Sequence, residues 1–120
     1  MSIDLADRRL EDVVSKRAAQ RLRLFRRDAE AAMPGQIADV VLFGSRARGD
    51  ARRDSDYDVA VFVRNLADPR AANHQFVRLT HEHLLAGYHI NALALPVGYL
   101  DTEGPGTLRF SIARDGVEVR

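Results

Sequence analysis

Apolar residues recur every three or four positions in the first quarter of the chain, which is the period of an amphipathic helix. Residues 4–32 contain neither glycine nor proline and are rich in alanine, leucine, arginine and glutamate, all good helix formers. The pattern predicts one long helix over 4–32, with a break only near its start and with Ser2 as a candidate N-cap. Met33-Pro34-Gly35 ends this helix, because proline disfavours helical geometry in the residue before it. Its apolar positions are Leu10, Val13, Val14, Ala18, Leu22, Phe25, Ala29 and Ala32.

Short runs of β-branched and apolar residues predict three strands, over 37–43, 57–63 and 89–95. A second helix is predicted over 68–87 and a short last helix over 107–114, before a final extended segment, 117–119. Residues 45–53 are predicted to form a turn and the start of a short helix, and 97–106 a loop. The inner stripe of the second helix is expected to be Ala72, Phe76, Leu79, His83 and Leu84. The order α-β-α-β-α-β-α favours an α+β fold, with helices packed against a small mixed sheet.

The length and composition indicate one domain over residues 1–120. With 46% hydrophobic and 29% charged residues, the composition is ordinary for a globular protein, and the absence of cysteine excludes a disulfide framework, a cysteine nucleophile and a cysteine-type zinc site. Charged residues near the N-terminus replace the apolar stretch of a signal peptide, and no run of about 18 apolar residues occurs. We therefore expect a cytoplasmic protein that does not bind membranes.

The formal net charge is only +1, but residues 8–27 carry +6, from eight basic and two acidic residues. A solvated helix face is the favoured interpretation, a partner surface is the second, and nucleic-acid binding is not favoured because the chain as a whole is nearly neutral. His81 and His83 do not predict a metal site, since positions i and i+2 of a helix do not face each other.

One segment, 42–63, carries candidate chemistry. A buried strand ends in Gly44-Ser45, where glycine lets a ligand approach the backbone and a helix start favours a phosphate. Asp56 and Asp58 alternate at the start of the next strand, so both carboxylates project to one side, and Tyr57 between them points to the core. Paired carboxylates suit Mg²⁺, and nearby arginines such as Arg46 can neutralise phosphate charge. The combination predicts a nucleoside triphosphate held by Gly-Ser and by metal on the aspartate pair.

Gly44-Ser45-Arg46-Ala47-Arg48-Gly49, followed by Ser55-Asp56-Tyr57-Asp58-Val59, resembles the signature of the DNA polymerase β-like nucleotidyltransferase superfamily. The similarity is greatest to the minimal nucleotidyltransferases of HEPN/MNT toxin–antitoxin pairs. It extends more weakly to residues 111–117, which are similar to the C-terminal end of those proteins. The resemblance implies that Gly44, Ser45 and Arg46 bind the nucleotide and that Asp56 and Asp58 are the catalytic metal ligands.

The third strand departs from the family pattern, which usually supplies a third carboxylate there. Asn91 occupies the best-matching position; an amide oxygen ligates metal weakly and cannot act as a base. His89, two residues earlier on the same face, is the candidate substitute base. We therefore expect Asn91 to be a third, weak metal ligand and the transfer to be slow.

The resemblance implies Mg²⁺-dependent transfer of AMP from ATP to a hydroxyl of a partner protein. That partner would be a HEPN-type toxin, held in a hetero-oligomer and modified on a tyrosine. Two alternatives stay open. One is a degenerate antitoxin that neutralises its toxin by binding alone, and the other is a free-standing enzyme that acts on an RNA or an antibiotic.

Overall fold

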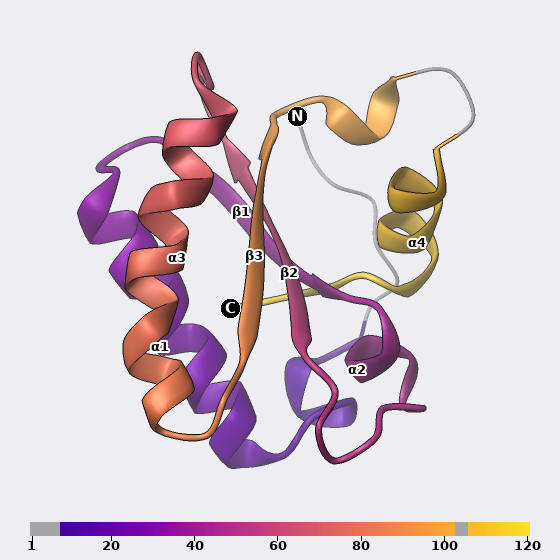
Figure 1. Cartoon of the computed structure of the whole chain (residues 1–120). Helices are drawn as coiled ribbons and strands as arrows, with labels where there is room; N and C mark the ends of the chain where they lie inside the picture. Colours follow the sequence, from indigo (N-terminus) through magenta and orange to yellow (C-terminus); the bar gives the residue numbers. More distant parts are fainter. Residues whose placement is uncertain (1–7, 103–105) are drawn as a thin grey trace.

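The computed structural model describes residues 8–102 and 106–120. A four-stranded mixed sheet in the order β3-β2-β1-β4 forms its centre, with α1 and α3 on one face and α4 on the other (Figure 1). The strands are β1 (Ile37–Phe43), β2 (Tyr57–Val63), β3 (Ile90–Pro96) and β4 (Val117–Glu118). The helices are η1 (Leu10–Asp12), α1 (Lys16–Ala32), α2 (Ser45–Arg48), α3 (Pro69–Leu85), η2 (Tyr99–Asp101) and α4 (Thr107–Asp115). The α+β class and the mixed sheet are confirmed.

The first helix is shorter than predicted. The sequence pattern predicted one helix over 4–32, but the chain forms a 3₁₀ turn, η1, and α1 begins only at Lys16. The Ser15 hydroxyl accepts a hydrogen bond from the amide of Ala18 at 3.1 Å, so Ser15 is the N-cap of α1. A periodic apolar pattern cannot reveal such a stop, because Val13 and Val14 still pack against the core from the non-helical segment. Ser2, the predicted N-cap, lies outside the described residues.

Both faces of the sheet are buried, but unequally. Phe25 of α1 and Phe76 of α3 meet edge to face, with ring centroids 6.2 Å apart, over the first face. On the second face Ile112 of α4 packs with Val41 and Phe62 of the central strands. The strand interiors therefore lack a polar side, which explains why 57–63 becomes apolar throughout.

The second predicted helix, α3, begins and ends within two residues of its predicted bounds. Asp68 caps it by accepting from the amide of Ala71 at 3.1 Å, and Pro69 occupies its first turn. One predicted inner position is wrong: Leu84 is 48% exposed, whereas His83 is buried beside it. Neighbouring helix positions differ by about 100° around the axis, so the two side chains cannot share one face fully.

Three other boundaries differ slightly from the prediction. Strand β3 runs from Ile90 through Pro96, η2 occupies part of the predicted loop 97–106, and β4 pairs with β1 through Val117 and Glu118. Proline is tolerated in β3 because this strand lies at the edge of the sheet.

The basic N-terminal cluster is partly used inside the molecule. Arg23 forms an ion pair with Glu11 at 2.8 Å, and Arg26 donates to the carbonyl of Val119 at 2.7 Å. Arg21 lies over the ring of Tyr88, 5.5 Å from its centroid. Several of these cations therefore fasten α1 to the rest of the domain, and the predicted fully solvated face describes only part of the cluster. Among the helices that the structure describes, none has the length and apolar composition needed to cross a bilayer.

Candidate active site

The predicted site residues meet at one end of the sheet, where β1 ends and where β2 and β3 begin. Phe43 of β1 is opposite Asp58 of β2, and Asp58 is opposite Asn91 of β3. Gly44 directly follows Phe43, so Gly44, Asp58 and Asn91 lie in a row across three strands. The two sequence segments that the signature joins are thus brought together by antiparallel pairing of β1 with β2.

Gly44 is required by both its conformation and its neighbour. Its φ of 76° and ψ of −157° belong to a region that is essentially restricted to glycine. A Cβ atom at this position would lie 2.7 Å from Oδ2 of Asp58. The absent side chain therefore leaves room for the Asp58 carboxylate and for whatever that carboxylate binds. Ser45, the first residue of α2, lies beside this opening.

The two carboxylates have different partners on β3. Oδ1 of Asp58 accepts a hydrogen bond from the Asn91 amide at 3.3 Å, whereas Oδ1 of Asp56 lies 2.8 Å from Nδ1 of His89. Burial raises the pKa of Asp58 above its ordinary value of 3.8; the charge of Asp56 raises it further, and Asn91, Arg48 and His89 oppose the shift. A cation placed between the carboxylates would relieve both the burial and the repulsion.

Arg46 lies apart from the carboxylate pair. Its guanidinium donates to the carbonyl of Ser55 at 2.9 Å and to that of Arg53 at 3.1 Å. It also covers the ring of Tyr57, 4.3 Å from the centroid. Tyr57 packs in the core on the other side of β2 from Asp58, as predicted. These contacts make Arg46 a brace for the loop between α2 and β2, and its role in nucleotide binding stays a prediction.

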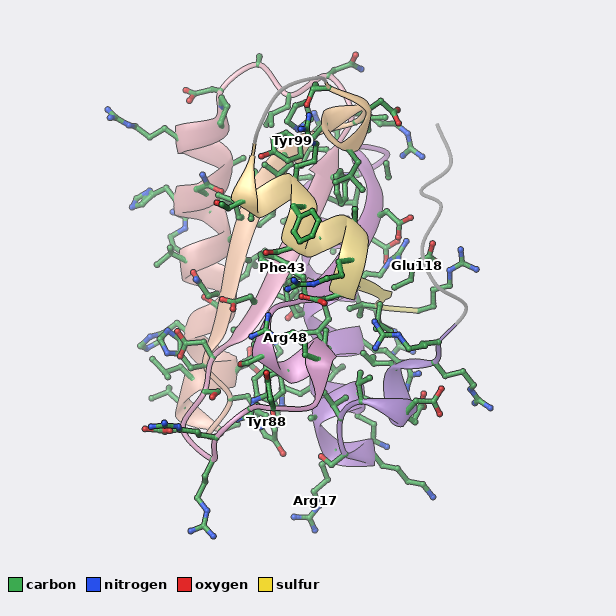
Figure 2. All side chains as sticks on the ribbon, turned by 90° about the vertical axis from the view of Figure 1, so that its right-hand side faces the viewer. Arg17, Phe43, Arg48, Tyr88, Tyr99 and Glu118 are labelled. Atoms are coloured by element: carbon green, nitrogen blue, oxygen red, sulfur yellow. The ribbon has the colours of Figure 1, made fainter. Side chains whose placement is uncertain are left out.

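Arg48, which the motif analysis gave no separate role, lies on the carboxylate side. Its Nη1 contacts Oδ2 of Asp115 at 3.2 Å and its Nε contacts Asp50 at 3.2 Å; Figure 2 shows Arg48 on the face that α4 covers. Asp115 is only 5% exposed and also accepts two hydrogen bonds from Arg114. The end of α4 therefore fixes α2, and with it Ser45, against the sheet. The weak resemblance of residues 111–117 was the only sequence signal for this contact.

The donor set fits a hard divalent cation. Two carboxylates and an amide oxygen are ligands that Mg²⁺ accepts, and Mg²⁺ usually binds one or two protein carboxylates together with substrate phosphates. Within residues 8–102 and 106–120, no group of three or more His, Cys, Asp or Glu side chains is arranged to hold a metal ion. A role of Asp56, Asp58 and Asn91 in binding a metal therefore stays a prediction.

Comparisons with known proteins agree with this geometry. The family model described as a nucleotidyltransferase domain matches residues 22–99, which contain the whole row of site residues. A search of curated proteins found no match.

Among solved structures, a proposed nucleotidyltransferase from Sulfolobus solfataricus has a TM-score of 0.61 at 19% identity, over 85% of this chain and 78% of that one. A mutant of the MntA-HpeT toxin–antitoxin has a TM-score of 0.53 at 15% identity, over 82% and 72% of the two chains. A toxin–antitoxin with AMP-PNP has a TM-score of 0.53 at 18% identity, over the same shares. At these identities the structures establish a shared fold.

Proposed function

Since this chain belongs to the nucleotidyltransferase domain family, we propose that it transfers AMP from ATP, with Mg²⁺, to a hydroxyl of a partner protein. The row of Gly44, Asp58 and Asn91 is the observation that carries this proposal. In this row the glycine that the proposal assigns to phosphate lies next to a carboxylate, Asp58, and to the polar side chain of Asn91. No other part of the described chain combines these features.

Each site residue has a distinct task in the transfer. Gly44 and Ser45 bind the phosphates, while Asp56 and Asp58 hold Mg²⁺ with Asn91 as a weak third ligand. Bound Mg²⁺ supplies the positive charge that stabilises the attacked α-phosphate and the departing pyrophosphate. The acceptor oxygen forms a bond to the α-phosphorus, and the bond from that phosphorus to the pyrophosphate oxygen breaks.

His89 is the candidate base for the hydroxyl proton. Its Nδ1 lies 2.8 Å from Asp56, so Nδ1 carries the hydrogen of this contact and Nε2 is left to accept a proton. The ring is 58% exposed and therefore accessible to an incoming acceptor. General-base assistance typically contributes about 10²–10⁴ in rate. This residue can thus replace part of what a carboxylate at position 91 would supply.

We further propose that the partner is a HEPN-type toxin and that this chain is its antitoxin, in a cytoplasmic complex. The fold similarity to two toxin–antitoxin structures, one of them with AMP-PNP, supports this assignment.

Mass spectrometry of the toxin protein co-expressed from the neighbouring reading frame tests the transfer. The wild-type chain should add AMP to it. Asp56→Ala together with Asp58→Ala should abolish the addition, whereas Asp54→Ala, which removes an exposed carboxylate from the preceding loop, should not. Equal addition by the double variant would exclude this mechanism.

Asn91 favours a second candidate, an antitoxin that acts by binding alone. Replacing Asn91 by Asp restores a charged ligand next to Asp58 and should raise the transfer rate by about 10²-fold or more. A binding-only antitoxin would instead transfer no AMP and would still neutralise the toxin after loss of both Asp56 and Asp58. Growth rescue by that double variant therefore decides between the two candidates.

A further inference from the structure

A groove of about 190 Å³ opens beside the candidate active site, between α3 and the edge strand β3. Its floor includes His89 and Asn91, two residues of the site, and its wall includes Val77, His81 and Leu84 of α3. The groove is therefore continuous with the acceptor side of the row described above. An occupant of the groove would lie next to the proposed base and the carboxylates.

Two apolar side chains of α3 are exposed in the wall of the groove, beside the polar Thr80 and His81. Val77 is 65% exposed and Leu84 is 48% exposed, although neither contributes to the core. Among the described residues that line the groove there is no lysine, arginine, phenylalanine, tyrosine or tryptophan. Surfaces that bind single-stranded nucleic acid combine basic grooves with stacking aromatic rings, so this lining favours a protein segment over an RNA.

The edge of β3 offers backbone groups to such a segment. The amide of Tyr57 in β2 donates to the carbonyl of His89 at 2.9 Å, so by alternation the peptide groups of Ile90, Ala92 and Ala94 point away from β2. The side-chain oxygen of Asn73 in α3 accepts a hydrogen bond from the amide of Ala94 at 2.7 Å. An outward peptide group therefore remains for an added strand at Ala92, which is half-buried and lines the groove, whereas Ile90 is buried.

The direction from which the acceptor hydroxyl would attack the phosphorus also favours the groove beside β3. In an in-line displacement the nucleophile and the leaving group lie on opposite sides of the transferred phosphorus. With the phosphates proposed at Gly44, directly after β1, and the proposed metal ligand Asp58 on β2, the side opposite the phosphates is β3. The acceptor hydroxyl would therefore arrive over His89 and Asn91, at the mouth of the groove.

We propose that this groove is the acceptor-binding site and that it takes an extended segment of the partner protein, with an aliphatic side chain against Val77 and Leu84 close to the hydroxyl-bearing residue. The inference rests on the proposed transfer for its direction, but the binding it describes can be measured separately.

The test compares Leu84→Glu with Leu85→Glu. The Leu85 side chain is 77% exposed on the same helix and does not line the groove, so the two variants add the same charge to neighbouring exposed positions. The purified toxin from the neighbouring reading frame is the probe. Leu84→Glu should weaken toxin binding and raise the KM for the toxin at least tenfold, while the KM for ATP changes less than twofold. Leu85→Glu should change neither the toxin affinity nor the two KM values.

Hydrogen exchange gives a second measurement on the wild-type chain. Toxin binding should slow exchange of the Ala92 amide, which an added strand would cover, by at least tenfold. Unchanged toxin affinity in Leu84→Glu, or a toxin that leaves exchange at Ala92 unaltered, would overturn the groove assignment. Binding that weakens as expected without any AMP transfer would leave the groove in place and would refute the proposed transfer instead. Transfer of AMP to an RNA or an antibiotic, with toxin binding unchanged in Leu84→Glu, would also overturn the assignment.

Discussion

Gly44→Ala perturbs the phosphate side of the site through two separable effects. The first is backbone strain, because φ of 76° with ψ of −157° is essentially a glycine conformation and costs other residues about 1–3 kcal/mol. The second is a contact: the new Cβ would lie 2.7 Å from Oδ2 of Asp58. The carboxylate has to turn away, and its hydrogen bond with Asn91 is then disturbed.

Gly49→Ala is the matched control for the strain alone. Gly49 also has a positive φ, of 88°, but a Cβ there meets nothing within 4 Å. It should cost about 1–2 kcal/mol. At roughly 4 °C per kcal/mol for a domain of this size, the melting temperature should fall by about 4–8 °C in Gly49→Ala and by at least as much in Gly44→Ala. Only Gly44→Ala should also weaken the stabilisation of the protein by Mg²⁺ and ATP.

A double-mutant cycle with Asp58→Ala isolates the contact. Once the carboxylate is gone, Gly44→Ala retains only the strain, so its cost in free energy of unfolding should fall by about 1 kcal/mol, within the range known for contacting residues. Urea denaturation of the four proteins measures this difference. Free energies that add to within about 0.5 kcal/mol would refute the claim that Gly44 exists to accommodate Asp58.

Three further predictions concern charged side chains. Burial raises the pKa of Asp58, so the folded state binds its proton more readily than the unfolded state, and the stability of the fold falls as pH rises above the ordinary value of 3.8. Asp58→Asn should therefore raise the melting temperature at pH 7 by a few degrees and remove stabilisation by Mg²⁺. An unchanged melting temperature at pH 7 would contradict this. The hydrogen bond from Arg114 lowers the pKa of Asp115, so the contribution of the ionised Asp115 to stability is present above pH 3.8 and is lost as pH falls through the folded pKa. Asp115→Asn should therefore lower the melting temperature by several degrees at pH 7 and by progressively less towards pH 2. Glu118→Gln is the control. Arg46→Ala should cost roughly 1–2 kcal/mol of stability through the lost loop contacts, as measured by urea denaturation. Calorimetry with Mg-ATP tests the predicted role of Arg46 in nucleotide binding separately, and an unchanged affinity would refute that role.

The row of site residues was accessible from the sequence because it depends on short-range features. Asp58 is the second residue of β2, Asp56 directly precedes that strand, and Gly44-Ser45 follows β1, so period and turn chemistry alone indicate where they point. Their meeting required only that β1 and β2 pair as neighbours, which is common for consecutive strands. The same reasoning placed Tyr57 in the core, where it is found.

The contacts that the sequence did not predict are long-range ones. Arg48 and Asp115 are 67 residues apart, and nothing in either local pattern indicates that a buried carboxylate ends α4 and receives an arginine from α2. The contacts of Arg46 could not be predicted either. The motif indicates a cation near phosphates, but not the loop carbonyl groups that accept hydrogen bonds from it. Side-chain partners of this kind depend on packing between elements rather than on periodicity.

Asn91 is the position where stability and catalysis make opposite demands. Its amide donates to Asp58, which offsets part of the cost of burying that carboxylate. A carboxylate in its place would lose this donor and add a third negative charge to a site where Asp58 is already hard to ionise. The same change would strengthen the ligand set for Mg²⁺. The proposed Mg²⁺ site would therefore assemble less readily with Asn91 than with an aspartate, and its occupation would depend on the phosphates of the substrate. Under the proposed transfer, nucleotide and metal would therefore bind together, and the groove beside β3 would determine which hydroxyl is modified.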